Sequence, residues 1–169
     1  EKMTAKFDSS SKPIAVGVVR EFKEITFADN STTSSEFIID SEEALFAFAA
    51  KAADFAPYTK AVVTADITLT KDWVTIEEFG AFEFDGGDKT ISGLTAPLFG
   101  TTTATIKNVK LADVAISFNN PSSSKGALVC AMEGGSITNC EVAGTLSVSN
   151  PTNDAYGYGG VVGVVTGAA

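Results

Sequence analysis

The sequence predicts a mainly β fold in which residues 37–169 wind into a right-handed parallel β-helix (solenoid) behind one capping α-helix. Three observations support it: short β-branched runs from residue 61 onward, a repeat near 30 residues within them, and one amphipathic segment just before them. Short apolar runs separated by Gly, Asn and Asp are typical of strands joined by tight turns. A repeat with two or three short strands per unit favours coils that stack and pair with one another.

Residues 1–36 differ in composition from the rest of the chain. Residues 14–19 and 24–27 form two short apolar runs that indicate strands, and Ser/Thr-rich stretches flank them. We predict that residues 1–36 are an extended N-terminal segment or the end of a preceding domain, and that the second domain covers residues 37–169.

Residues 41–55 carry the helical pattern. Asp40 is predicted to be the N-cap, with Glu43 completing a capping box. Apolar residues then recur at three- and four-residue spacing: Leu45, Phe48, Ala49, Ala52 and Phe55. Pro57 cannot continue the helix. Because a single amphipathic helix must bury its apolar stripe, we expect it to cap the open N-terminal end of the solenoid.

The clearest repeat joins Ile106-Lys107-Asn108-Val109-Lys110-Leu111 to Ile137-Thr138-Asn139-Cys140-Glu141-Val142, which begins 31 residues later. We expect Ile106 and Ile137 to be buried in adjacent coils, with Val109 facing Cys140. Asn108 and Asn139 fall where the chain must turn. Asn tolerates a left-handed backbone and can hydrogen-bond to the neighbouring coil.

A small-apolar run precedes each of these two units, at residues 96–100 and 126–130, and a third such run follows as Gly159-Gly160-Val161-Val162-Gly163. With the coil at residues 84–94 (Phe-Asp-Gly-Gly-Asp-Lys-Thr-Ile-Ser-Gly-Leu), these runs resemble the GLUG-motif and pectin-lyase-like β-helices of Bacteroidetes-type bacterial surface proteins. Gly93 stands where the resembled coil has Asn, and only one Gly-Gly-x-Val-Gly run is intact. The resemblance implies a secreted or outer-surface protein, with the option of a lipid anchor upstream, that serves in adhesion or binds glycans or proteins.

Composition and charge argue against several functions. With 21 Asp and Glu against 12 Lys and Arg, the net charge is −9, which disfavours nucleic acid and anionic lipid as partners. No apolar run approaches the roughly 18 residues of a membrane span, so no membrane insertion is expected. Without histidine the chain has no Ser-His-Asp triad. Cys130 and Cys140 are expected to be small, buried, reduced thiols, because a pair ten positions apart in a chain without histidine makes a poor zinc site.

We expect no catalytic residue, cofactor or metal. Asp85 and Asp88 lie in a Gly-Gly turn, where Asp is favoured for backbone reasons. Ser122 and Lys125 have the Ser-x-x-Lys spacing, as do Ser9 and Lys12, but both pairs fall in Ser-rich loops rather than at a helix start.

The best binding candidates are Tyr156, Tyr158 and Asp154, in the polar loop 150–160. Tyr on a loop offers a flat apolar face with a polar edge; the alternative is that this loop folds over the coil edge. We therefore expect a non-catalytic surface module. The alternative is the N-terminal part of a carbohydrate-active enzyme (polysaccharide lyase or hydrolase) whose catalytic coils lie elsewhere. No Ile-x-Asn unit follows the apolar run 160–165, so we expect the solenoid either to continue or to self-associate through its C-terminal edge.

Overall fold

The computed structural model describes residues 5–7, 23–25, 36–151 and 155–167. The chain divides into two compact units, Glu1–Ser34 and Ser35–Ala169. In the first unit, β1 (Ala5–Phe7) pairs antiparallel with β2 (Lys23–Ile25). The strand predicted over residues 24–27 overlaps β2, whereas the one predicted over residues 14–19 lies outside the described residues.

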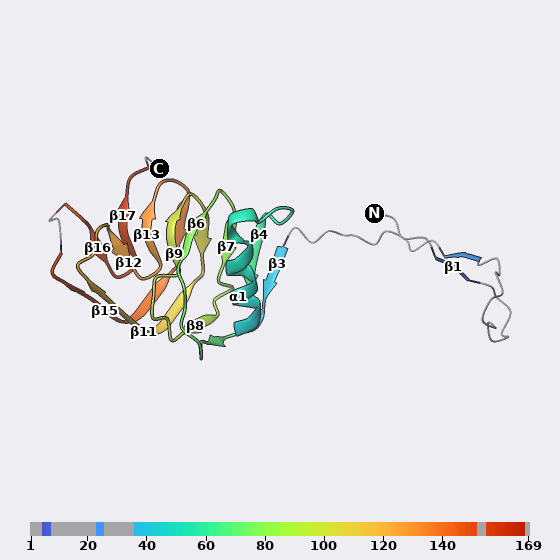
Figure 1. Ribbon diagram of the computed structural model, residues 1–169, viewed down its shortest axis with the longest axis horizontal. Helices are drawn as coiled ribbons and strands as arrows, with labels where there is room; N and C mark the ends of the chain where they lie inside the picture. The colour runs from blue at the N-terminus through green and yellow to red at the C-terminus, as the bar shows by residue number, and fades with distance from the viewer. Residues whose placement is uncertain (1–4, 8–22, 26–35, 152–154, 168–169) are drawn as a thin grey trace. The chain divides into compact units, whose positions relative to one another are not determined.

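The second unit is mainly β, with parallel sheets and one short helix (Figure 1). Sheet 1 has the order β14-β10-β7-β4-β3, sheet 2 the order β15-β11-β8-β5, and sheet 3 the order β17-β13-β9-β6; β12 and β16 form a two-stranded sheet. The strands of sheet 1 are β3 (Glu36–Ile39), β4 (Lys60–Val63), β7 (Glu83–Asp85), β10 (Thr105–Lys107) and β14 (Ser136–Thr138).

The strands of sheet 2 are β5 (Ile67–Thr68), β8 (Thr90–Ser92), β11 (Lys110–Asn119) and β15 (Glu141–Ser149). Those of sheet 3 are β6 (Ile76–Phe79), β9 (Phe99–Thr102), β13 (Val129–Met132) and β17 (Val162–Val165). The two-stranded sheet consists of β12 (Lys125–Gly126) and β16 (Tyr158–Gly159).

From β4 onward the chain passes through sheets 1, 2 and 3 in turn and then returns to sheet 1. Each return places a strand parallel to the one from the previous round. Ile106, for example, pairs with Phe84 on one side and with Ile137 on the other. Residues one sequence repeat apart are thus partners in the sheets, and the predicted pairing of Ile106 with Ile137 is confirmed.

Two asparagines form the corner between sheets 1 and 2. Asn108 and Asn139 have φ of +54° and +50°, in the left-handed region. Asn139 Nδ2 donates to Asn108 Oδ1 at 2.8 Å, and Asn108 Nδ2 donates to Asp85 Oδ1 at 3.0 Å. The prediction of left-handed turns bonded to the neighbouring strand layer is confirmed.

The helix begins one residue later than predicted. α1 spans Glu42–Lys51 and continues as a 3-10 turn, η1 (Ala52–Asp54). Its N-cap is Ser41, whose Oγ accepts a hydrogen bond from the backbone N–H of Ala44. The prediction of Asp40 as N-cap was wrong: its carboxylate instead accepts from Ser41 Oγ at 3.2 Å and so orients the hydroxyl that caps the helix.

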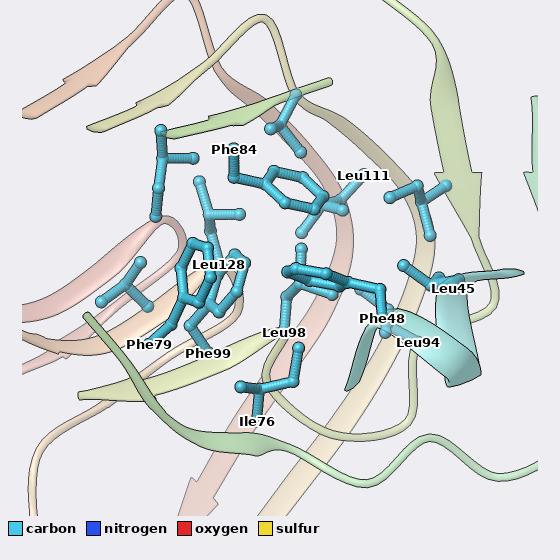
Figure 2. Packing of buried hydrophobic residues seen from close by; sticks show 14 of the residues in the cluster. Leu45, Phe48, Ile76, Phe79, Phe84, Leu94, Leu98, Phe99, Leu111 and Leu128 are labelled. Atoms are coloured by element: carbon cyan, nitrogen blue, oxygen red, sulfur yellow. The ribbon is translucent and has the colours of Figure 1, made fainter. Parts of the chain in front are cut away.

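The apolar stripe of α1 is buried against the first strands of the sheets. Leu45 and Phe48 are fully buried, and Ala52 nearly so. Phe48 lies with its ring centroid 5.4 Å from those of both Phe79 and Phe84 (Figure 2). The helix lies beside β3 and β4, at the opposite end of the unit from β15 and β17 (Figure 1). The expected burial of this stripe against the β region is confirmed.

Burial falls toward the last strands. Ile106 and Val109 are fully buried, whereas Ile137 and Cys140 are only half-buried. The expectation that Ile137 and Cys140 are buried was therefore wrong, because their strands or turns belong to the outermost layer among the described residues and lack a neighbour on one side. Cys140 still contacts the backbone of Val109, and Cys130 and Cys140 are both free thiols.

Candidate functional site

A hollow of about 340 Å³ lies beside sheet 3. Thr101, Ala131 and Val164, which pair in register on three adjacent strands, line it from the sheet. Phe118 lines it from the end of β11, and Tyr156 lines it from the segment that leads to β16. A hollow of this size lies at the lower end of the range for small-molecule sites, roughly 300–1,000 Å³.

Glycine keeps one row of sheet 3 open beside the hollow. A Cβ built on Gly100 would lie 2.6 Å from the carbonyl oxygen of Glu77, closer than non-bonded atoms approach. Only glycine therefore fits at this position without a shift of β6. The neighbouring strands consequently pack closely here, and at Gly100 the hollow is bounded by backbone rather than by a side chain.

Hydrogen bonds hold the segment that carries Tyr156. The backbone N–H of Gly157 donates to Ser124 Oγ at 3.0 Å, and the backbone N–H of Lys125 donates to the carbonyl oxygen of Gly157 at 2.9 Å. Lys125 also pairs in register with Tyr158. The short β12–β16 pairing thus positions Tyr156 at the hollow, although Tyr156 itself belongs to no strand.

Two groups of opposite charge line the hollow. Lys125 Nζ lies 5.4 Å from the centroid of the Phe118 ring, within the range of a cation–π contact. Glu77 lines the same hollow from β6 and is exposed. Within residues 36–151 and 155–167, neither Lys125 nor Glu77 forms an ion pair. Both therefore retain hydrogen-bonding capacity for a ligand.

Cys130 also lines the hollow, and the pKa of its thiol determines whether it can act as a nucleophile. Burial raises the pKa of the Cys130 thiol; the weak hydrogen bond to the carbonyl oxygen of Gly126 and the charge of Lys125 oppose this rise, while Glu77 adds to it. The thiol is therefore protonated at neutral pH. Because the thiolate is the nucleophilic form of cysteine, Cys130 is not an activated nucleophile.

A second hollow, of about 390 Å³, lies near the end of η1 and shares Thr101 with the first. Glu78 and Glu133 bring two carboxylates to it, and Phe82 and Ala52 form part of its apolar lining. Glu77 and Glu78 are adjacent on β6, so one strand supplies an acidic group to each hollow.

The three residues predicted for binding have different positions. Tyr156 lines the first hollow and is half-buried. Tyr158 does not line it; its hydroxyl is buried and has no hydrogen-bond partner among the described residues. Asp154 lies outside the described residues. The structure therefore brings only Tyr156 of this set to the hollow.

Sequence reasoning missed three residues of this hollow: Glu77, Phe118 and Lys125. The sequence drew attention to Lys125 through its Ser-x-x-Lys spacing with Ser122, but Ser122 is exposed and does not line the hollow. Their proximity depends on how the sheets stack. One usable signal was the repeat itself, which relates Glu77 to Cys130 through the register of β6, β9 and β13.

The acidic turn after β7 is a structural feature. Asp85 Oδ1 accepts from the backbone N–H of Gly87 at 3.0 Å, and Asp88 has φ of +57°, so the interpretation of both as turn residues is confirmed. In the described part of the chain, no group of three or more Cys, Asp or Glu side chains is placed to hold a metal ion. In the same part, no helix is long and apolar enough to cross a bilayer.

Comparison of the chain with protein-family models, with curated proteins and with solved structures finds no match.

Proposed function

We propose that residues 36–167 form a right-handed parallel β-helix, capped at one end by α1, which acts as a non-catalytic binding module on the surface of a bacterium or in its secretions. The repeated passage through three parallel sheets, the in-register stacking and the asparagine corner support the β-helix. The resemblance to GLUG-motif surface proteins supports the location, with a lipid anchor upstream as one means of attachment.

The observation that carries the binding proposal is the hollow beside sheet 3. It combines the aromatic side chains of Phe118 and Tyr156 with hydroxyl groups and two charged side chains. Aromatic faces pack against the C–H face of a sugar ring, while hydroxyl and charged groups bind its hydroxyls. A glycan is therefore the ligand that we favour, and a surface protein is the second choice. The net charge of −9 argues against nucleic acid.

Self-association is a further part of the proposal. Ile137, Val142 and Leu146 of the outermost strands are apolar and only half-buried. A second copy of this chain could cover them through the exposed edge of β15, because an unpaired strand edge can accept another strand.

A glycan-array screen of the whole chain tests the binding function. Binding to a defined glycan is expected, and Tyr156→Ala should weaken it by about tenfold, by analogy with nucleic-acid bases, for which loss of a stacked aromatic side chain costs roughly 1–3 kcal/mol. Tyr158→Phe is the matched control, because the Tyr158 hydroxyl does not line the hollow. An array on which no glycan is bound, or binding by Tyr156→Ala as strong as by the wild-type chain, would refute this hollow as a glycan-binding site.

A carbohydrate-active enzyme is the second candidate, favoured by the two carboxylates of Glu78 and Glu133 in the second hollow. Glycoside hydrolysis uses a pair of carboxyl groups. Incubation with each glycan bound on the array should release no reducing ends or unsaturated products if the module is non-catalytic. Release that Glu133→Gln abolishes would establish the enzyme instead.

A further inference from the structure

The hollow beside sheet 3 offers both signs of charge to one ligand. Lys125, held over the Phe118 ring, and Glu77, exposed on β6, line the same space of about 340 Å³. Both lie within electrostatic reach of one buried group: Lys125 lowers the pKa of the Cys130 thiol, and Glu77 raises it. A ligand in this hollow therefore meets the two charges together.

This pairing disfavours a charged ligand. A carboxylate on the ligand would be attracted by Lys125 but repelled by Glu77, and a protonated amine would be attracted by Glu77 but repelled by Lys125. A neutral ligand avoids both conflicts. The carboxylate of Glu77 accepts hydrogen bonds from neighbouring hydroxyls, and the ammonium of Lys125 donates to other oxygens.

We infer that the hollow selects a neutral sugar residue with vicinal hydroxyls over uronic acids and free amino sugars. This inference rests on the proposed glycan-binding function and adds the class of glycan. Glu77 and Lys125 bind the polar edge of the sugar, and Phe118 and Tyr156 contact its apolar face. The volume is small for a site, so one or two sugar residues occupy it.

Calorimetric titration with neutral and acidic oligosaccharides tests the inference. Short gluco-, manno- and xylo-oligosaccharides serve as the neutral probes, and oligogalacturonates serve as the acidic ones. Neutral probes should bind with an affinity that changes less than about twofold between 0.05 and 0.5 M salt, because no net ligand charge is screened. Acidic probes should bind at least about tenfold more weakly.

Glu77→Gln gives opposite results for the two ligand classes. It should weaken a neutral sugar about three- to tenfold, because an amide oxygen is a weaker acceptor than a carboxylate. If the natural ligand were acidic, the same substitution would strengthen binding by removing repulsion. Thr75→Ala, a change of an uncharged side chain in the same hollow, is the matched control and should produce no dependence on ligand charge. Thermal unfolding checks that each variant is folded.

The outcomes separate this inference from the proposed function. Preferential, salt-sensitive binding of acidic probes that Glu77→Gln strengthens would overturn the neutral-sugar inference and leave the glycan-binding function intact. Binding of neutral probes that Tyr156→Ala does not weaken, or no binding of any probe, would overturn the function and the inference together. The expected result is binding of neutral probes that is insensitive to salt and that both Tyr156→Ala and Glu77→Gln weaken.

Discussion

The asparagine corner allows a sharp test of how the stacked strands are stabilised. Asn108→Asp keeps the size of the side chain, and Asp also tolerates the φ of +54° at this position. The substitution replaces the Nδ2 donor with a second carboxylate beside Asp85. The lost hydrogen bond to a charged group is worth about 1.5–3 kcal/mol. Repulsion between the two carboxylates adds roughly another 1 kcal/mol, a value reduced because the positive charge of Lys107 Nζ lies 3.6 Å from Asp85 Oδ2.

The expected loss of unfolding free energy at pH 7 is therefore about 2.5–4 kcal/mol, measured by urea denaturation with an unchanged slope. The repulsion raises the folded-state pKa of the carboxylate pair in Asn108→Asp above its unfolded value. The folded variant then binds a proton more readily than the unfolded chain, so it regains stability as the pH falls from 7 toward 4.

Asn108→Gly is the matched control for this experiment. It loses both side-chain hydrogen bonds of Asn108, including the one accepted from Asn139 that Asn108→Asp can retain, and it keeps the left-handed backbone without a new charge. Its destabilisation should be about 2–3 kcal/mol and should not diminish between pH 7 and pH 5. Equal pH profiles for Asn108→Asp and Asn108→Gly, or wild-type stability for either, would refute the assigned role of the Asn108–Asp85 contact.

Four further predictions concern the wild-type chain and single variants. Burial raises the pKa of Asp85, but hydrogen bonds from Asn108 and Gly87 and the charges of two lysines lower it by more, so the net shift is downward from 3.8. The stability that Asp85 contributes is therefore present above pH 3.8 and is lost as the pH falls below it, and unfolding measured along an acid titration monitors this loss. Phe48→Ala should cost about 3–5 kcal/mol in urea denaturation, since the ring is fully buried; a cost below 1 kcal/mol would contradict its place in the core. Tyr158→Phe should leave thermal stability unchanged or raise it by up to about 1 kcal/mol, because the buried hydroxyl has no partner among the described residues; a large loss would reveal an unseen partner. Leu146→Glu should reduce self-association in sedimentation equilibrium, and a wild-type chain that stays monomeric would refute the contact.

The stacking of strands was accessible from the sequence because it repeats. Residues that occupy the same position in successive rounds face the same surroundings, so Ile106 and Ile137 carry the same chemistry, as do Asn108 and Asn139. The left-handed backbone at Asn108 and Asn139 was predictable from the residue type together with their place where the chain must turn. The repeat could not show which round is outermost, and for that reason the burial of Ile137 was overestimated.

The hollow was less accessible, because its residues come from non-equivalent positions. Glu77 and Lys125 lie on separate rounds of the chain, and no periodic pattern links an exposed strand position to a residue of the short β12. The N-cap error has a different cause. Asp40 and Ser41 are both good capping residues, and only the backbone geometry, with Ser41 at φ −156° and ψ 167°, distinguishes them.

The outer faces of the three sheets differ in how their polar groups are used, and this difference supports the proposal that a ligand binds beside sheet 3. On sheet 1, Lys60 Nζ lies within 3.7 Å of carboxylates on three residues, including Asp85. On sheet 2, Ser117 and Ser147 hydrogen-bond to each other across adjacent strands at 2.8 Å. Polar groups that satisfy one another hold the layers together and have little left to offer a ligand. Beside sheet 3 the two charged groups of the hollow have no such partner in the described part of the chain. A ligand that supplies hydroxyls would therefore gain most at this face.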